Sequence, residues 1–204
     1  MFIVFEGLDG SGKSTQAKKL HEFFVSCGKN CLLTYEPTSS ELGSLARAVT
    51  KGELSLEHES LALLFAADRY EHFTKKISPV LADGGTVVCD RYYYSNIVYQ
   101  GISEQSISRI LVYNQQVMKR PPDIVFFLDA MPQVCLTRLK SSRKDISIYE
   151  NMNYLETLSG RYQALFKRLT ENIVIIETSG KSEEDVSAMI IKAYNAIITP
   201  PLLA

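Results

Sequence analysis

The residues with the most explicit chemistry lie near the amino terminus, at positions 7–14, where the sequence is GLDGSGKS. This segment matches the phosphate-binding pattern G-x4-G-K-[ST], known as the P-loop. It lies between an apolar run at residues 2–5 and a segment with helical apolar spacing, which is the strand-to-helix context that the pattern requires. A turn rich in glycine and serine without a ligand is the alternative, but it does not account for all these conditions together. We therefore expect a bound nucleoside triphosphate.

The chemistry expected of this loop is anion binding. Glycines at positions 7, 10 and 12 let the backbone approach closely, so that successive N–H groups point at phosphate oxygens, and the following helix adds its free N–H groups and the positive end of its dipole. Lys13 would reach the β- and γ-phosphates, and the hydroxyl of Ser14 would bind Mg²⁺ held between them. The expected ATP-binding residues are Gly7, Gly10, Ser11, Gly12, Lys13, Ser14 and Thr15.

Elements that would position this loop recur along the chain. Apolar runs of strand length lie at residues 2–6, 30–35, 86–90, 124–129 and 173–176. Helical patterns lie at residues 13–24, 42–49, 55–76, 103–120, 132–139, 151–169 and 183–198, with a further helix restarting at Ser78-Pro79. This alternation predicts an α/β fold with a parallel five-stranded sheet and helices on both faces. Residues 91–101 receive no element, because they are too polar at their centre for the core and too aromatic for a simple linker.

Charged side chains follow the ends of the expected strands, at Asp9, Glu36, Asp90, Arg91 and Asp129. Ligands of an open parallel sheet bind at the carboxyl ends of its strands, so these side chains are candidates for the site. Asp90 would bind Mg²⁺ directly or through water, and Arg91 would hold a second phosphate. The alternative is an aspartate that caps a turn and pairs with the neighbouring arginine.

A basic, polar stretch at residues 141–147 is expected to be a mobile loop, within a lid of about residues 138–150. Phosphoryl transfer needs cations over the transferring group, and a kinase must exclude water from it. Cations of this lid are Arg138, Lys140, Arg143 and Lys144. A solvated charged loop would have the same composition.

Composition limits the classes of protein. The 204 residues are 46% hydrophobic and 22% charged, which predicts one ordinary globular domain over residues 1–204. A net charge of −1 argues against nucleic acid or a membrane surface as partner, and no apolar run approaches membrane-spanning length. Four scattered cysteines without metal-ligand spacing, and a core strand where a signal peptide would lie, favour reduced thiols in a cytoplasmic protein.

Several motifs in this order resemble those of the thymidylate kinase family. They are the P-loop with Asp9 inside it, Glu36-Pro37-Thr38, Gly43 with Arg47, Phe65 with Arg69, Asp90-Arg91-Tyr92 with Ser95, Tyr99 and Gln100, Pro122-Asp123 before Leu128-Asp129, and Tyr149-Glu150. Many enzymes share the P-loop, whereas residues 90–100 together with Phe65 and Arg69 are much more specific. The resemblance covers residues 2 to about 150, and it implies the P-loop kinase fold with a small lid.

The resemblance implies transfer of a phosphoryl group from ATP to dTMP, a homodimer, and a role for each matching residue. Phe65 would stack on thymine and Arg69 would hydrogen-bond its carbonyl edge; Arg47 and Arg91 would hold the dTMP phosphate. Asp9 would meet the 3′-hydroxyl, and Tyr99 would pack against the deoxyribose. The full dTMP set is Asp9, Glu36, Arg47, Phe65, Arg69, Arg91, Ser95, Asn96, Tyr99 and Gln100, and the metal set is Ser14 and Asp90. Without the resemblance, core packing would be favoured for Phe65, and a core or interface position for Tyr99.

Three positions depart from the family pattern. Gly10 stands where one branch has an arginine, so the chain resembles the branch whose lid supplies the catalytic arginine. Arg143 is then the first candidate, with Arg138 and Lys144 behind it, and the catalytic set is Lys13, Arg91 and Arg143. Tyr35 and Ile148 replace arginines that the family usually carries.

Two other functions share the P-loop. A deoxynucleoside kinase, or another small P-loop kinase, is the nearest alternative, with Glu36 as the base that a neutral hydroxyl requires. A GTP-dependent switch protein is less favoured, because no N-K-x-D segment is present. Three histidines, His21, His58 and His72, have no evident partners in the sequence, so we expect them at the surface or capping helices.

Overall fold

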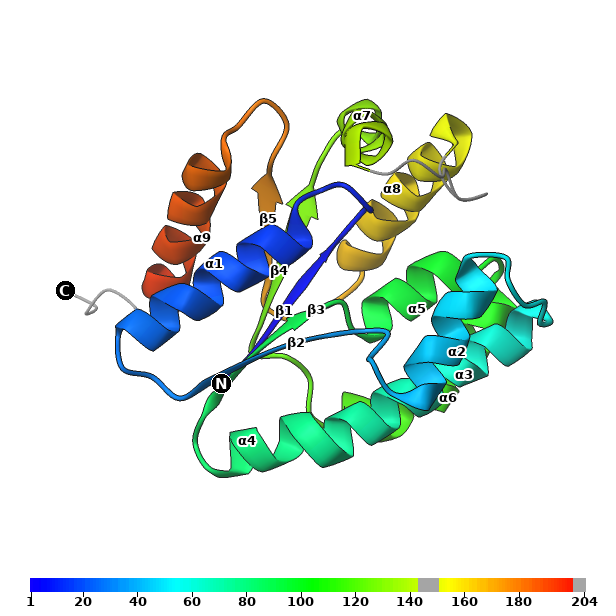
Figure 1. Cartoon of the computed structure of the whole chain (residues 1–204), viewed down its shortest axis with the longest axis horizontal. Coiled ribbons are helices and arrows are strands. Elements are labelled where there is room, and N and C mark those ends of the chain that lie inside the picture. Colours follow the sequence, from blue (N-terminus) through cyan, green and yellow to red (C-terminus); the bar gives the residue numbers. More distant parts are fainter. Residues whose placement is uncertain (143–150, 200–204) are drawn as a thin grey trace.

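The computed structural model describes residues 1–142 and 151–199, and it contains a five-stranded sheet in which every neighbouring pair of strands is parallel. The strand order is β2-β3-β1-β4-β5 (Figure 1). Their bounds are β1 (Phe2–Gly7), β2 (Cys31–Tyr35), β3 (Thr86–Asp90), β4 (Ile124–Asp129) and β5 (Ile173–Glu177). The predicted parallel sheet is confirmed, with β1 and its P-loop at the centre.

Helices surround the sheet on both faces (Figure 1). Their bounds are α1 (Lys13–Ser26), α2 (Glu41–Thr50), α3 (His58–His72), α4 (Ser78–Ala82), α5 (Tyr93–Gln100), α6 (Glu104–Met118), α7 (Pro132–Ser142), α8 (Met152–Phe166) and α9 (Glu183–Ile198). One core cluster joins α1 and α9 to the sheet. A second cluster joins α3, α5, α6 and α8 to the opposite face.

The central strand explains how one short segment serves two cores. Side chains of a strand alternate between faces, so Phe2 and Val4 pack in one cluster while Ile3 and Phe5 pack in the other. All four are fully buried. A strand covered on both faces gives a continuous apolar run in the sequence, which is why the P-loop strand could be predicted.

The segment without a predicted element forms helix α5, so leaving it unassigned was wrong. Its apolar side chains Tyr93, Tyr94, Ile97 and Val98 are buried in the core below it. The polar residues at 96 and 100 are four apart and hydrogen-bond each other on another face, which is helical spacing. Eight residues are too few for this periodicity to stand out.

Two predicted helix boundaries were also wrong. No break precedes Pro79, because a π-helical turn η1 (Phe73–Ile77) joins α3 to α4. Proline lacks an N–H and its ring clashes with the carbonyl four residues earlier, so a regular α-helix through it would be distorted. Helix α7 continues to Ser142, so Arg138, Lys140 and Ser141 are helical and not part of a loop.

Two further properties are the absence of a membrane-spanning helix in the described part of the chain and the state of the cysteines. Within residues 1–142 and 151–199, no helix combines the length and the apolar character needed to cross a membrane. Its four cysteines are free thiols: Cys89 and Cys135 are buried, Cys31 is half-buried and Cys27 is exposed.

Candidate active site

The P-loop connects the end of β1 to the start of α1, as predicted. Gly10 has a φ of 81°, and a Cβ there would lie 2.7 Å from the carbonyl oxygen of Cys135 in α7. Position 10 therefore has no room for a side chain while α7 packs against the loop. This contact gives a physical reason why an arginine is missing there.

Two cations lie against the P-loop. Nζ of Lys13 donates to the carbonyl of Leu8 at 2.7 Å, and burial lowers the pKa of this ammonium group. Nη1 of Arg138 donates to the carbonyl of Gly10 at 3.1 Å. Both interactions use loop carbonyls, which an incoming phosphate could replace as the stronger acceptor.

A possible metal site follows the end of β3. Strand register places Asp90 beside Phe5 of β1 and Tyr35 of β2, and the hydroxyl of Ser14 donates to Oδ2 of Asp90. The other oxygen, Oδ1, is buried and has no hydrogen-bond partner among the described residues. Ser14 and Asp90 line one cavity of about 210 Å³. A carboxylate and a hydroxyl are oxygen ligands of the kind that Mg²⁺ prefers, so these two residues fit the predicted ion.

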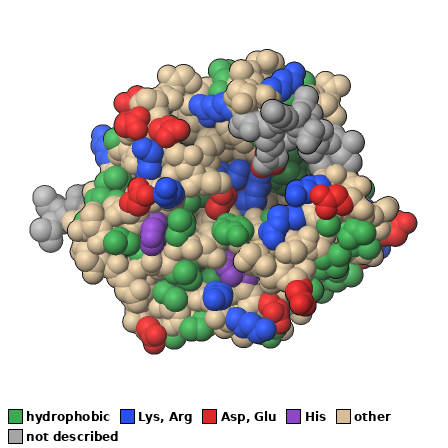
Figure 2. All heavy atoms as spheres, in the orientation of Figure 1, with side chains coloured by type: hydrophobic (Ala, Val, Ile, Leu, Met, Phe, Trp, Pro, Cys, Tyr) green, Lys and Arg blue, Asp and Glu red, His purple; other side chains and the backbone are tan. Residues whose placement is uncertain are grey.

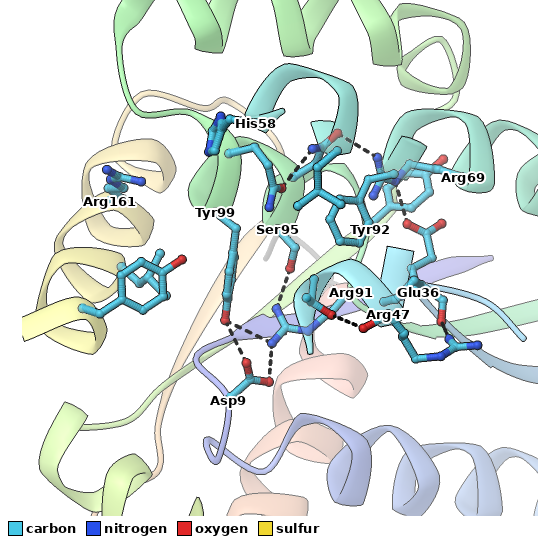
Figure 3. Close-up of a pocket in the computed structure, with 18 of the residues that line it drawn as sticks. Asp9, Glu36, Arg47, His58, Arg69, Arg91, Tyr92, Ser95, Tyr99 and Arg161 are labelled. Atoms are coloured by element: carbon cyan, nitrogen blue, oxygen red, sulfur yellow. Dashed lines mark hydrogen bonds and ion pairs between the residues drawn. The ribbon is translucent and has the colours of Figure 1, made fainter. Parts of the chain in front are cut away.

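Arg91 occupies the centre of the site and has an unusual backbone. Its φ of 73° makes it the one non-glycine residue with positive φ among those described, and its N–H is held by the carbonyl of Phe5. Such a conformation persists where the surroundings enforce it and is frequent at functional sites. Nη2 donates to Asp9 at 2.7 Å and to the hydroxyl of Tyr99 at 3.2 Å, and Nη1 donates to Ser95 at 2.7 Å (Figure 3).

A larger cavity of about 500 Å³ opens beside Arg91. Figure 2 shows basic side chains in the hollow near the middle of this face. Every predicted dTMP-binding residue lines the cavity: Asp9, Glu36, Arg47, Phe65, Arg69, Arg91, Ser95, Asn96, Tyr99 and Gln100. These residues come from the P-loop, the segments after β2 and β3, and helices α2, α3 and α5, so the structure brings together positions between 9 and 100 of the printed sequence. Their roles in binding stay predictions.

Arg69 lies at one wall of this cavity and is only 2% exposed. Nε donates to Glu36 at 2.6 Å, and Nη1 donates to Asn114 at 2.7 Å and to Asn96 at 3.3 Å. Nη2 makes no hydrogen bond with the described residues. Three elements therefore hold the guanidinium in one orientation and leave one nitrogen for a ligand.

His72 was predicted at the surface or at a helix cap, and this is wrong. The residue is 5% exposed, with Nδ1 3.0 Å from Glu36 and Nε2 2.7 Å from the hydroxyl of Thr34. Its partners lie 36 and 38 positions earlier in the sequence. The one available signal was the spacing of His72, three residues after Arg69 on the same helix.

Two buried acids were also missed. Glu6 accepts hydrogen bonds from the N–H groups of Tyr92 and Ser95 and from the hydroxyls of Ser95 and Tyr162, and burial raises its pKa. It thereby anchors the start of α5, next to Arg91. A carboxylate inside an apolar strand run is costly unless its oxygens are satisfied, and this was a signal available in the sequence.

Asp68 performs the corresponding task for the segment after β2. It accepts from the N–H and hydroxyl of Thr38 and from the hydroxyl of Ser40, the residue that caps α2. Arg47, at the end of α2, donates back to the carbonyl of Pro37 at 2.6 Å. Asp68 therefore ties the loop and the helix that carry one of the predicted phosphate ligands.

The remaining predicted positions have different surroundings. Phe65 lines the larger cavity and also packs against the small cluster formed by Ala46, Val49 and Leu61. Asp129 lines neither cavity, and burial raises its pKa. The predicted catalytic Arg143, together with Lys144, Ile148, Tyr149 and Glu150, lies outside the described residues.

Comparison with known proteins gives one consistent result. The sequence model of the thymidylate kinase family matches residues 5–190. A probable thymidylate kinase of Methanocaldococcus jannaschii is 41% identical over 191 residues, 94% of each chain. A putative thymidylate kinase of Treponema pallidum is 35% identical over 190 residues, 91% of this chain and 89% of the relative. A thymidylate kinase of Leptospira interrogans is 35% identical over 173 residues, 85% of each chain. Because the family model matches residues 5–190 of the 204, the chain belongs to the thymidylate kinase family.

Proposed function

We propose that this protein is a thymidylate kinase, which transfers the γ-phosphoryl group of ATP to dTMP and produces ADP and dTDP. The observation that carries this proposal is the meeting of two cavities at Arg91, which lines both of them. One cavity holds Ser14 and Asp90, suited to a metal-bound nucleotide, and the other is lined by all ten residues predicted to bind dTMP. A phosphate in each cavity would face Arg91 from the two sides.

The acceptor phosphate of dTMP is already anionic at neutral pH, so this reaction depends on positioning and charge more than on a general base. Arg47 and Arg91 would grip that phosphate, while Lys13 would leave the carbonyl of Leu8 for the triphosphate. Mg²⁺ bound by Ser14 and Asp90 would neutralise charge on the phosphates. Arg143 stays the proposed catalytic arginine of the lid.

Arg69 and Phe65 would recognise the base. Nη2 of Arg69 is available to donate to a thymine carbonyl, because the other donors of the guanidinium are already used. Phe65 lies four residues earlier, on the same face of α3, where its ring can stack on a pyrimidine.

The alternative activity, phosphorylation of a nucleoside, would need Glu36 as the base. Both oxygens of Glu36 are occupied, one by Nε of Arg69 and one by Nδ1 of His72, and its side chain is 3% exposed. With both oxygens already accepting hydrogen bonds inside the protein, neither is free to take the proton of a substrate hydroxyl. These contacts favour the kinase that acts on a monophosphate.

A coupled assay of ADP release, with ATP and each of dTMP, dUMP, dCMP, AMP and thymidine, tests the proposal. We expect dTMP to have the highest kcat/KM, and thymidine to give no product. Phosphorylation of thymidine without phosphorylation of dTMP would overturn the proposal.

Four finer properties belong to the same proposal. The metal is Mg²⁺, the protein is a homodimer, its compartment is the cytoplasm, and nucleic acid is not a partner. Exposed apolar side chains on adjacent helices α3 and α6, among them Leu63, Tyr70, Leu111 and Val112, support an interface. Size-exclusion chromatography with light-scattering detection would measure the molar mass in solution and so determine the oligomeric state.

A further inference from the structure

We propose that His72 is a positioning residue for recognition of the base. It holds Glu36, and Glu36 in turn sets the orientation of Arg69, which lines the cavity and whose Nη2 has no hydrogen-bond partner among the described residues. This inference rests on the proposed function, because it takes Arg69 as the residue that meets the base.

The contacts form a continuous chain through buried groups. Nδ1 of His72 lies 3.0 Å from Oε1 of Glu36, and Oε2 of Glu36 accepts from Nε of Arg69 at 2.6 Å. Because a carboxylate only accepts hydrogen bonds, Nδ1 carries the proton of the first contact. In the neutral ring, Nε2 then accepts from the hydroxyl of Thr34 at 2.7 Å.

Because these side chains are buried, the loss of any one hydrogen bond among them is energetically costly. The side chains of Arg69, Glu36 and His72 are 2–3% exposed. A buried carboxylate that loses one of its donors keeps an unsatisfied oxygen, so it shifts toward another donor or admits water. Either change would move the carboxylate that fixes Nε of Arg69.

The planar guanidinium transmits this orientation to the cavity. Its nitrogens lie in one fixed plane, so the bonds from Nε to Glu36 and from Nη1 to Asn114 determine where Nη2 points. A thymine carbonyl accepts from such a donor, whereas the amino group of cytosine at the same ring position repels it. The orientation of Arg69 should therefore set the preference for thymine over cytosine.

Glu36 and His72, together with Cys89, could be taken for a metal site, because their ligand atoms lie within 4.8 Å of one another. Every one of these ligand atoms already has a protein partner: Sγ of Cys89 donates to the carbonyl of Arg91 at 3.1 Å. The guanidinium of Arg69 adds a positive charge beside Glu36. Positioning of Arg69 accounts for the contacts without an ion.

Two substitutions separate positioning from mere packing. His72→Leu replaces the imidazole with an apolar side chain of moderate size and removes the N–H that donates to Glu36, whereas His72→Asn keeps an N–H near the position of Nδ1. We expect His72→Leu to raise KM for dTMP about tenfold, with kcat and KM for ATP changed less than about twofold. The ratio of kcat/KM for dTMP over dCMP should fall about tenfold, and His72→Asn should restore most of both quantities. Thermal unfolding of each variant measures the folded fraction.

The variant Arg69→Gln distinguishes failure of this inference from failure of the proposed function. If His72 acts through Arg69, adding His72→Leu to Arg69→Gln should change KM for dTMP by less than about twofold. The inference would be overturned if His72→Leu raised KM for dTMP as much in the Arg69→Gln background as in the unmodified protein. Equal kinetics of His72→Leu and His72→Asn would also overturn it. If Arg69→Gln keeps the preference for dTMP over dCMP, the proposed role of Arg69 in base recognition fails first, and the inference fails with it.

Discussion

At the scale of single residues, the backbone geometry at Gly10 bears on which arginine is predicted to be catalytic. Its φ is positive, and a Cβ at this position would lie 2.7 Å from the carbonyl oxygen of Cys135, so no side chain fits, while Arg138 of α7 donates to the carbonyl of Gly10. A branch of the family with an arginine at this position would need a different packing of α7. The prediction that a lid cation, Arg143, serves the charge of the transferring phosphoryl group follows from the absence of that arginine.

Replacement of this glycine should be costly for two separable reasons. We expect Gly10→Ala to lower the free energy of unfolding by about 2–4 kcal/mol, from strain at positive φ and from the clash with α7. Gly28→Ala is the matched control, since its φ is 72° but nothing lies within 4 Å of its Cβ position. That control should lose only about 1–2 kcal/mol, the cost of φ alone. Urea unfolding measures both, and equal losses would mean that the contact with α7 contributes nothing.

At the scale of elements, prediction succeeded where one local pattern decides the structure. Strands β3 and β4 have the predicted bounds because each is an apolar run that ends at an aspartate. Helix α5 was missed because its polar face serves the cavity, which interrupts the apolar pattern. His72 and Asp68 were missed for another reason: their partners lie at least 28 positions away, and only the packing of α3 beside the segment after β2 brings them together.

Asp68 provides the prediction at this scale, since it connects α3 to the loop and helix that carry Arg47. Asp68→Ala should leave three half-buried donors, two on Thr38 and one on Ser40, without their acceptor and lower the free energy of unfolding by about 2–4 kcal/mol. We also expect KM for dTMP to rise about tenfold while KM for ATP stays within about twofold, because the loop belongs to the acceptor side.

Glu71→Ala in the same helix is the control, because the ion pair of Glu71 with Lys75 is solvent-exposed. Such a pair contributes little, so this variant should behave as the unmodified protein. An Asp68→Ala variant with unchanged KM for dTMP would mean that the loop keeps its position without this carboxylate.

At the scale of the whole molecule, the two cavities share Glu36 and Arg91 but differ in the rest of their lining. Binding in either cavity should stabilise the fold, by an amount that depends on ligand concentration relative to its Kd. At a concentration of 100 Kd, dTMP should add about 2.7 kcal/mol, which raises Tm by roughly 5–10 °C in a chain of this size.

Asp90→Asn tests whether the cavities hold different ligands, because Asp90 lines only the smaller one. In this variant the Tm shift caused by dTMP should be retained, since the acceptor cavity is intact. The additional shift that Mg²⁺ gives to ADP, measured against ADP with EDTA, should be largely lost, because the carboxylate that fits the ion is gone. Each shift is taken relative to the ligand-free variant, so a change in its basal stability does not enter. Loss of the dTMP shift with retention of the Mg²⁺-dependent shift would reverse the assignment of the two cavities.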